Sequence, residues 1–505
     1  MLAVLQFDSA SVSLLERMLA QGRLPTLAGL IERGRRYEME GPGTHFAAGA
    51  FHTLYSGLDI ADHGVFYPFQ WSAPDQRARY MSALDPPAPI WERLAEVGQT
   101  TLAIDPYESR PPTAEVAGAT LVCGWQLVDR VVLRAWSRPH GLRRELGRLY
   151  GRPRHAEEIF GRPYLRELLA LRRTLVAGPG RVADAGLHLL SERPYDLAWL
   201  TFTAAHIAGH QFWDQSQLDP DKLDDRTRRV LESALGDVYE AVDQAMGRVV
   251  VALPEDTDLI VCSAVGMDVN TSRADLLPEM LDAVLRGGPK EDADRAAGAI
   301  WRLRAAVPAS ARGRVARALP DAATLDLTAR LELRGMDWSA TRAFAHPADN
   351  QGYVRANVRG RERDGIVAEA DLDGLYDEIA EGLATFVDAN GAPAVAGVDR
   401  TRDVFGDGAR LDSLPDFVVR WADRPATQLP YVESPDFGRV MRFGAASGRA
   451  GNHTEGDAWA IVLPGASSHR APERPARVVD IAATAASLGG LDTEGMAGEP
   501  LLEPA

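Results

Sequence analysis

Short apolar runs recur along the chain and alternate with longer segments in which apolar residues repeat at helical spacing. Such runs are typical of strands buried on both faces, and they predict strands at residues 2–7, 101–105, 196–202, 258–263, 417–421 and 458–463. The periodic segments predict helices at residues 11–22, 24–34, 90–98 and 227–253. Alternating strands and helices favour an α/β fold, in which helices sandwich a mostly parallel central sheet.

Two regions break this alternation. Residues from about 110 to 190 are rich in Arg and have a helical pattern without a convincing buried strand. Residues from about 283 to 345 are rich in Ala and Arg and have a similar helical pattern. Both are predicted to be helical cap insertions that roof the carboxyl edge of the sheet. Residues 1–505 are therefore expected to form a single domain with two caps.

The charge balance narrows the choice of partners. The chain has 71 acidic and 55 basic residues, a formal net charge of -16, with 46% hydrophobic and 25% charged residues overall. A negative field opposes binding to nucleic acid and to anionic membranes. It still allows a small anionic metabolite as substrate, because a bound metal inverts the local field.

The number of cysteines, the start of the chain and the lengths of the apolar runs indicate in which cellular compartment the protein works. Cys123 and Cys262 are the only cysteines, which excludes a disulfide scaffold and a cysteine-based zinc site and fits a reducing cytoplasm. The start of the chain has no basic segment followed by an apolar stretch, and no apolar run reaches the length of a membrane span. We expect a cytoplasmic protein without a membrane partner.

Two histidines mark the most informative segment. His206 and His210 stand four residues apart just after the predicted strand at 196–202. On a helix this spacing brings two imidazoles to one face, where they can bind the same metal ion. The carboxyl edge of an α/β sheet is also where ligands bind. The alternative is that the two histidines cap a helix or form hydrogen bonds with polar groups between packed elements.

Four segments taken together resemble a known family. They are residues 4–8, residues 56–64, the segment with His206 and His210, and residues 450–456 with His453. In this order the chain resembles the alkaline phosphatase superfamily, specifically its type I phosphodiesterase/nucleotide pyrophosphatase branch. The resemblance runs nearly end to end, through further matches at residues 24–30, 239–243, 349–357, 416–421 and 480–484.

The resemblance implies a two-metal site at the carboxyl edge, in which two ions clamp the oxygens of a displacement at phosphorus. The ligands of the first ion match His206, His210 and His453. Asp8 matches one ligand of the second ion. The remaining positions depart from the family: Ala47 stands in the place of the nucleophile, and Ala264 and Val265 stand in the places of an aspartate and a histidine. The second ion thus retains one ligand of its usual set.

Other residues near these positions offer substitutes. Thr44 could present a hydroxyl nucleophile with His45 as its base, although the loop at residues 41–43 is explained equally by its glycines and proline. Asp8 could orient a water or a substrate group, or could cap the helix that begins at Ser11. Asp268 and Asn270 could supply replacement oxygens, or could serve only the turn.

Two functions from different classes are compatible with these residues. The first is a metal-dependent enzyme with a remodelled single-metal centre, most simply Zn²⁺ with Mn²⁺ or Fe²⁺ as alternatives, that hydrolyses or transfers a phospho-, phosphono- or sulfo-ester of a small anionic metabolite. The second is a catalytically inactive phosphodiesterase homologue that binds a ligand or protein partner, or one repurposed for non-phosphoryl chemistry in secondary metabolism. The oligomeric state stays open, a homodimer included.

Overall fold

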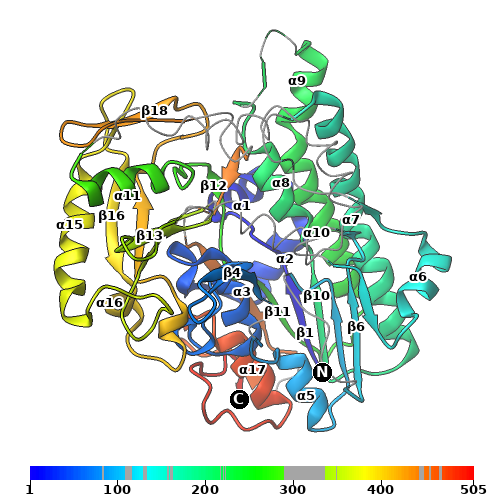
Figure 1. Ribbon diagram of the computed structural model, residues 1–505. Helices are drawn as coiled ribbons and strands as arrows, with labels where there is room; N and C mark the ends of the chain where they lie inside the picture. The colour runs from blue at the N-terminus through cyan, green and yellow to red at the C-terminus, as the bar shows by residue number, and fades with distance from the viewer. Residues whose placement is uncertain are drawn as a thin grey trace.

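The architecture is that of a computed structural model. It describes residues 1–504 except 82–84, 108–115, 129–133, 156–158, 160–162, 217, 220, 222, 289–335, 349, 443–448, 454–455 and 466–468. Within these residues the chain forms a large nine-stranded sheet, a separate four-stranded sheet and several small ribbons. Figure 1 shows the four-stranded sheet, in yellow and orange, to one side of the large sheet.

Five parallel strands form the centre of the large sheet, in the order β11-β1-β10-β5-β6. Their bounds are β1 (Leu2–Gln6), β5 (Thr101–Ile104), β6 (Ala119–Cys123), β10 (Leu197–Thr201) and β11 (Asp258–Ser263). Every residue of these strands is buried, as the continuous apolar runs predicted for β1, β5, β10 and β11. Because the strands are parallel, their carboxyl ends meet at one edge.

Further strands extend the large sheet on both sides, and of these β21 (Ala458–Leu463) and β8 (Trp136–Arg138) run antiparallel to the central strands. On one side β21 pairs antiparallel to β11 and to β2 (Arg35–Glu40), followed by β23 (Ala476–Arg477), and on the other β8 closes the sheet. The predicted mixed, mostly parallel α/β sheet is therefore confirmed.

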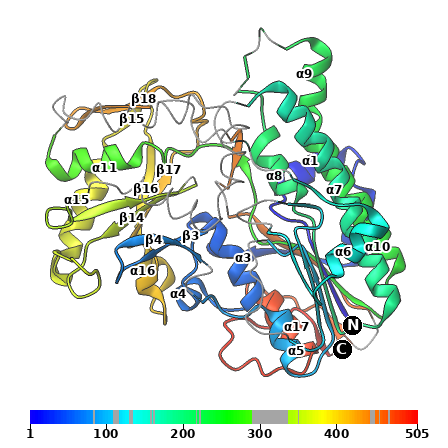
Figure 2. The ribbon, with the colours of Figure 1, turned by 45° about the vertical axis from the view of Figure 1, so that its right-hand side comes forward.

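Helices cover the large sheet on both faces (Figure 2). One layer holds α1 (Val12–Ala20), α2 (Pro25–Arg33), α7 (Leu165–Glu192), α8 (Ala204–Phe212) and α10 (Ala234–Ala252), and the other holds α3 (Ala47–Ser56), α5 (Ile90–Glu96) and α17 (Asp480–Leu488). The predicted helix at 227–253 is broken at Ser233, where α9 (Asp225–Glu232) ends before α10 begins. In the described part of the chain, no helix is long and apolar enough to span a bilayer.

The four-stranded antiparallel sheet is a feature that the sequence patterns did not separate from the first sheet. Its strands are β13 (Ala343–His346), β14 (Gly352–Ala356), β17 (Phe417–Trp421) and β16 (Val395–Arg400), covered by α11 (Leu277–Arg286) and α15 (Leu372–Ala384). It buries a hydrophobic cluster of its own. The strand predicted at residues 417–421 is confirmed as β17, and the structure places it in this second sheet, which its apolar run alone does not reveal.

The prediction for residues 110–190 is corrected in one respect. This region contains β6, a fully buried strand that pairs with β5 in the central sheet, so the expected absence of a buried strand is wrong. This strand is as long as β1 and β10, but it is followed by an Arg-rich sequence with helical spacing, which conceals it. The region also contributes β8 to the large sheet, and it is helical as predicted in α6 (Leu142–Tyr150) and α7. The second predicted cap, at 283–345, lies largely outside the described residues, and the single-domain assignment stays a prediction.

Short elements connect the rest. They are α4 (Ile60–His63), α16 (Thr401–Phe405), the 3₁₀ turns η1 (Pro42–Thr44), η4 (Glu369–Asp371) and η5 (Leu411–Ser413), and the ribbons β3–β4 (Phe69–Ser72, Arg77–Tyr80), β7–β9 (Leu127–Val128, Arg154–His155), β12–β20 (Asp268–Val269, Gly451–Asn452), β15–β18–β19 (Val387–Asp388, Tyr431–Ser434, Gly438–Met441) and β22–β24 (His469–Arg470, Glu503–Pro504).

Candidate metal centre

Helix α8 carries two of the predicted ligands. It begins at Ala204, three residues after β10 ends, so His206 and His210 lie past the carboxyl end of a central strand and one helical turn apart. All residues of α8 are buried. Gly209 allows close packing on this helix, since a Cβ atom there would lie 2.2 Å from Sδ of Met267.

The third ligand arrives on the β12–β20 ribbon. His453 directly follows β20, and the backbone N–H of Ala450 donates to the carbonyl oxygen of His210 at 2.7 Å. Gly451 touches α8 so closely that a Cβ atom would lie 2.4 Å from the carbonyl oxygen of Gly209. Glycines on both partners therefore let the ribbon approach the helix and bring His453 to the other two histidines.

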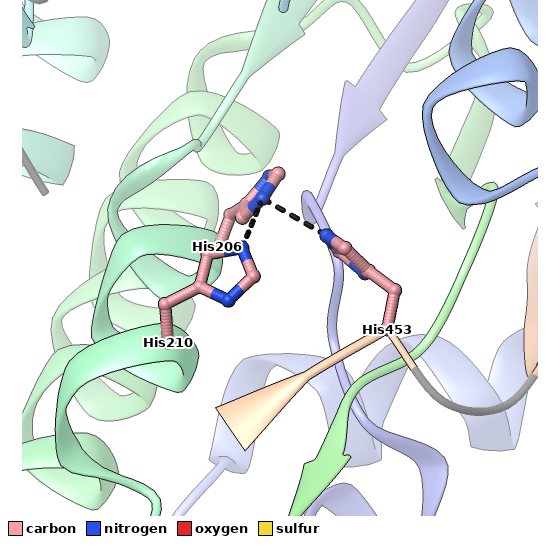
Figure 3. A group of neighbouring side chains, drawn as sticks. All are labelled: His206, His210 and His453. Atoms are coloured by element: carbon pink, nitrogen blue, oxygen red, sulfur yellow. Dashed lines mark hydrogen bonds between the residues drawn. The ribbon is translucent and has the colours of Figure 1, made fainter. Parts of the chain in front are cut away.

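The three imidazoles converge through their Nε2 atoms, as Figure 3 shows. Nε2 of His206 lies 3.1 Å from Nε2 of His210 and 3.0 Å from Nε2 of His453. The three side chains are buried, with 2%, 1% and 4% of their residue surfaces exposed. Among the residues that the structure describes, this is the one group of three or more histidine, cysteine or acidic side chains close enough to share an ion.

The opposite nitrogen of each ring faces a hydrogen-bond acceptor. Nδ1 of His210 lies 3.0 Å from the carbonyl oxygen of Gly451, and Nδ1 of His453 lies 3.0 Å from that of Gly266. Nδ1 of His206 lies 3.3 Å from Oδ2 of Asp8. A carbonyl oxygen can only accept, so this network assigns the ring proton to Nδ1 and leaves a lone pair on Nε2.

The rings of His210 and His453 are held neutral. Burial is the main cause that lowers the pKa of both imidazoles well below the usual value, and repulsion from Arg449 and from the neighbouring histidines lowers the pKa of each further. Neutral rings with their protons on Nδ1 cannot form hydrogen bonds between their Nε2 atoms.

The arrangement fits a transition-metal ion. Three lone pairs that face one another in a buried site need a shared electrophile, and a tetrahedral zinc site with Zn–N distances of about 2.0–2.1 Å places its nitrogens roughly 3.3 Å apart. The observed Nε2 separations of 3.0 and 3.1 Å are close to that value. Acceptors on the far nitrogens, as found here, are the usual support of histidine ligands.

Asp8 lies behind this group. It is fully buried at the end of β1, and its Oδ2 contacts the nitrogen of His206 that points away from the other rings. The next residue, Ser9, has a left-handed φ of 56° and donates its hydroxyl to Oδ1 of Asp8 at 3.1 Å. Ser11, whose Oγ accepts from the N–H of Leu14, caps α1, so the capping role weighed for Asp8 is wrong.

Two aromatic rings that the sequence did not single out also hold His206. The ring of Phe51 on α3 stacks on it with a centroid distance of 5.9 Å, and the ring of Tyr107 lies 4.4 Å away. These contacts fix the plane of the ring between the two helix layers.

Solved structures were compared with this fold. A phosphonoacetate hydrolase from Sinorhizobium meliloti, in complex with phosphonoformate, superposes with a TM-score of 0.51 at 15% identity, over 97% of this chain and 95% of that one. A mutant of the alkaline phosphatase PafA superposes with a TM-score of 0.53 at 10% identity, over 99% and 98% of the chains. The chain has the alkaline phosphatase fold. Comparison of the sequence with protein-family models and with curated proteins finds no match.

In this alkaline phosphatase fold, three positions of the expected second ion are apolar. Ala47 opens α3, Ala264 directly follows β11, and Val265 comes next; all three are buried. The loop before α3 packs on Val265, since a Cβ atom on Gly43 would lie 3.0 Å from its Cγ2. None of these three side chains offers a metal ligand or a nucleophile, and Asp8 as a ligand of a second ion stays a prediction.

The substitutes proposed for the lost groups are placed as follows. Thr44 is exposed, and its carbonyl oxygen shares the Nε2 donor of Gln351 with the carbonyl oxygen of His453, at 2.8 and 3.2 Å. Nε2 of His45 lies 2.8 Å from Oδ2 of Asp399, which also binds Arg420. Thr44 therefore lies beside the loop of a predicted ligand, while Nε2 of His45 is engaged by a carboxylate.

Asp268 and Asn270 serve the ribbon. Oδ1 of Asp268 accepts from the N–H of Val269 at 2.6 Å, and Asn270 binds the N–H of Ser272 and the carbonyl oxygen of Arg449. These contacts match the turn role weighed from the sequence.

Proposed function

We propose that the protein is a metal-dependent hydrolase that holds one divalent cation on His206, His210 and His453 and acts on a small anionic ester. The observation that carries the proposal is the convergence of three Nε2 lone pairs while every Nδ1 faces an acceptor. A three-histidine set with an open position is a recognised catalytic zinc arrangement.

The donor set favours Zn²⁺. All three ligand atoms are imidazole nitrogens, which suit zinc and ferrous iron, whereas Mn²⁺ prefers oxygen ligands. The contact of Asp8 with His206 would strengthen the site further, because a carboxylate behind a ligating imidazole fixes the ring and raises its basicity. A cation held here supplies Lewis-acid chemistry at its open coordination position.

The residues around the histidines bear on the substrate and on the attacking group. The positive charge of Arg449 acts on both His210 and His453, so it also favours an anion at the centre. Since Ala47 has no hydroxyl, water is the attacking group in this proposal, with the exposed Thr44 hydroxyl as the alternative. The acidic composition and the two cysteines support a small-molecule substrate and a cytoplasmic enzyme.

A second candidate is a homologue that keeps the metal without catalysis, or that serves non-phosphoryl chemistry in a biosynthetic pathway. It is favoured by the joint presence of Ala47, Ala264 and Val265 at positions where the family resemblance implies a nucleophile and two ligands. A single ion neutralises less of the charge on a transferring phosphoryl group than two ions do.

The test is an assay in which zinc-reconstituted protein is incubated with a panel of alkyl phosphates, phosphonates and sulfates. Hydrolysis is measured as the release of the inorganic anion. We expect turnover of at least one member, lost in the variant His210→Ala and retained in His188→Ala, which changes a surface histidine paired with Glu192 on α7. Zinc binding without turnover of any member would favour the inactive homologue.

A further inference from the structure

Gln351 lies between the two loops that border the three histidines. It directly precedes β14, and only 4% of its surface is exposed. Its side-chain nitrogen donates to the backbone carbonyl oxygens of Thr44 and of His453 at 2.8 and 3.2 Å. One amide group thus joins the last residue of η1 to the loop of a proposed metal ligand.

The oxygen of the same amide has no partner. Oε1 of Gln351 is buried and has no hydrogen-bond donor among the residues that the structure describes. The orientation of the amide is settled by its surroundings, since exchanging oxygen and nitrogen would put Oε1 against two carbonyl oxygens and lose both hydrogen bonds. The open acceptor is therefore a property of the site.

A buried acceptor without a donor is costly, and native structures keep such a group where a water or a ligand completes it. Nε2 of Gln351 donates to the backbone carbonyl oxygen of His453, so its amide group lies against the loop that carries one of the proposed metal ligands. The charges described there, from the proposed cation and Arg449, attract the anionic part of a ligand. Oε1 only accepts hydrogen bonds, so its partner has to be a hydrogen-bond donor elsewhere on that ligand.

We propose that Oε1 of Gln351 accepts a hydrogen bond from a hydroxyl or ammonium group of the substrate. The site would then favour anionic esters that carry a hydroxyl or ammonium group near the ester over those that lack one. This inference rests on the proposed function, whose metal binds the anionic group. A ligand without the donor leaves Oε1 unpaired on binding, which is the basis on which sites that hydrogen-bond a substrate reject its apolar analogue.

Paired probes test the preference on the unmodified protein. Zinc-loaded protein is titrated calorimetrically with 2-aminoethyl phosphate against ethyl phosphate, and with glycerol 3-phosphate against propyl phosphate. We expect the donor-bearing member of at least one pair to bind at least about tenfold more tightly. Equal affinities within both pairs would overturn the inference while leaving the metal and the anion site intact. Zinc uptake without binding of any probe would contradict the proposed function and this inference together.

Two variants assign the preference to Oε1. Gln351→Lys keeps a donor for the carbonyl oxygens of Thr44 and His453 and removes the acceptor, so we expect the affinity ratio within the preferred pair to fall to about one. Gln99→Met is the control, since the amide of Gln99 binds the carbonyl oxygen of Gly489 and its loss should leave the ratio unchanged. Zinc content and melting temperature show that each variant is folded. A tenfold preference that persists in Gln351→Lys would refute the role of Gln351.

Discussion

Replacing His210 by alanine is the perturbation that bears most directly on the metal site. It removes one of three converging Nε2 atoms, and among the described residues no fourth histidine, cysteine or carboxylate lies close enough to all three to share the ion. Structural zinc sites gain about 10–16 kcal/mol from four ligands, or about 3–4 kcal/mol per ligand. Loss of one ligand should therefore weaken zinc binding by about 10²- to 10³-fold.

The expected loss can be measured in two ways. Competition with a chromogenic chelator gives the zinc dissociation constants of the wild type and of His210→Ala. In thermal unfolding, free zinc at 1,000 times the wild-type dissociation constant should stabilise the wild type by about 4 kcal/mol and His210→Ala by at most about 1.4 kcal/mol. His188→Ala is the matched control and should behave as the wild type. A dissociation constant within threefold of the wild type in His210→Ala would refute the assignment of His210 as a ligand.

Three further predictions concern the residues around the site. Asp8→Ala should weaken zinc binding about 10- to 100-fold, measured by the same competition, because His206 loses the carboxylate on Nδ1; unchanged affinity would contradict this role. Burial raises the pKa of Asp105 to about 6 although it accepts from the N–H groups of Trp125 and Gln126. The folded protein therefore binds the proton of the Asp105 carboxyl group more tightly than the unfolded chain does. The free energy of unfolding of the wild type should fall by about 3 kcal/mol relative to that of Asp105→Asn as the pH rises from about 4 to above 6, measured by denaturant unfolding. Parallel pH profiles of the two proteins would exclude a raised pKa of Asp105. Ala47→Thr should not raise the turnover of aryl phosphate mono- and diesters above the wild-type level, since Ala264 and Val265 still provide no second-ion ligands; a large metal-dependent gain in Ala47→Thr would contradict the loss of the second-ion site.

The central strands were predictable because burial on both faces leaves a continuous apolar run. The same signal cannot assign a strand to a sheet, so the sequence does not show that β17 belongs to the second sheet. It also fails for β6, whose apolar run is as long as that of β1 but borders an Arg-rich sequence with helical spacing. Pairing partners are set by tertiary contacts far apart in sequence, for which the local pattern carries no information.

In the candidate site, too, some features could be predicted from the sequence and others could not. His206, His210 and His453 could be predicted because the spacing of the first two and the family resemblance both pointed to them, and the structure brings them together. Their supports could not, since two are the backbone carbonyl oxygens of Gly266 and Gly451, and every residue has a carbonyl group. The ligands could therefore be predicted from their side chains, whereas the backbone groups that orient them could be found only from the folded structure.

The single-metal assignment is tested most directly by anomalous scattering at the zinc edge from crystals of zinc-reconstituted protein. We predict one peak per chain, about 2.0–2.1 Å from the Nε2 atoms of His206, His210 and His453. A peak elsewhere, or none between the three rings, would contradict the metal centre. A second peak at Asp8 would contradict the claim that only one ion is bound.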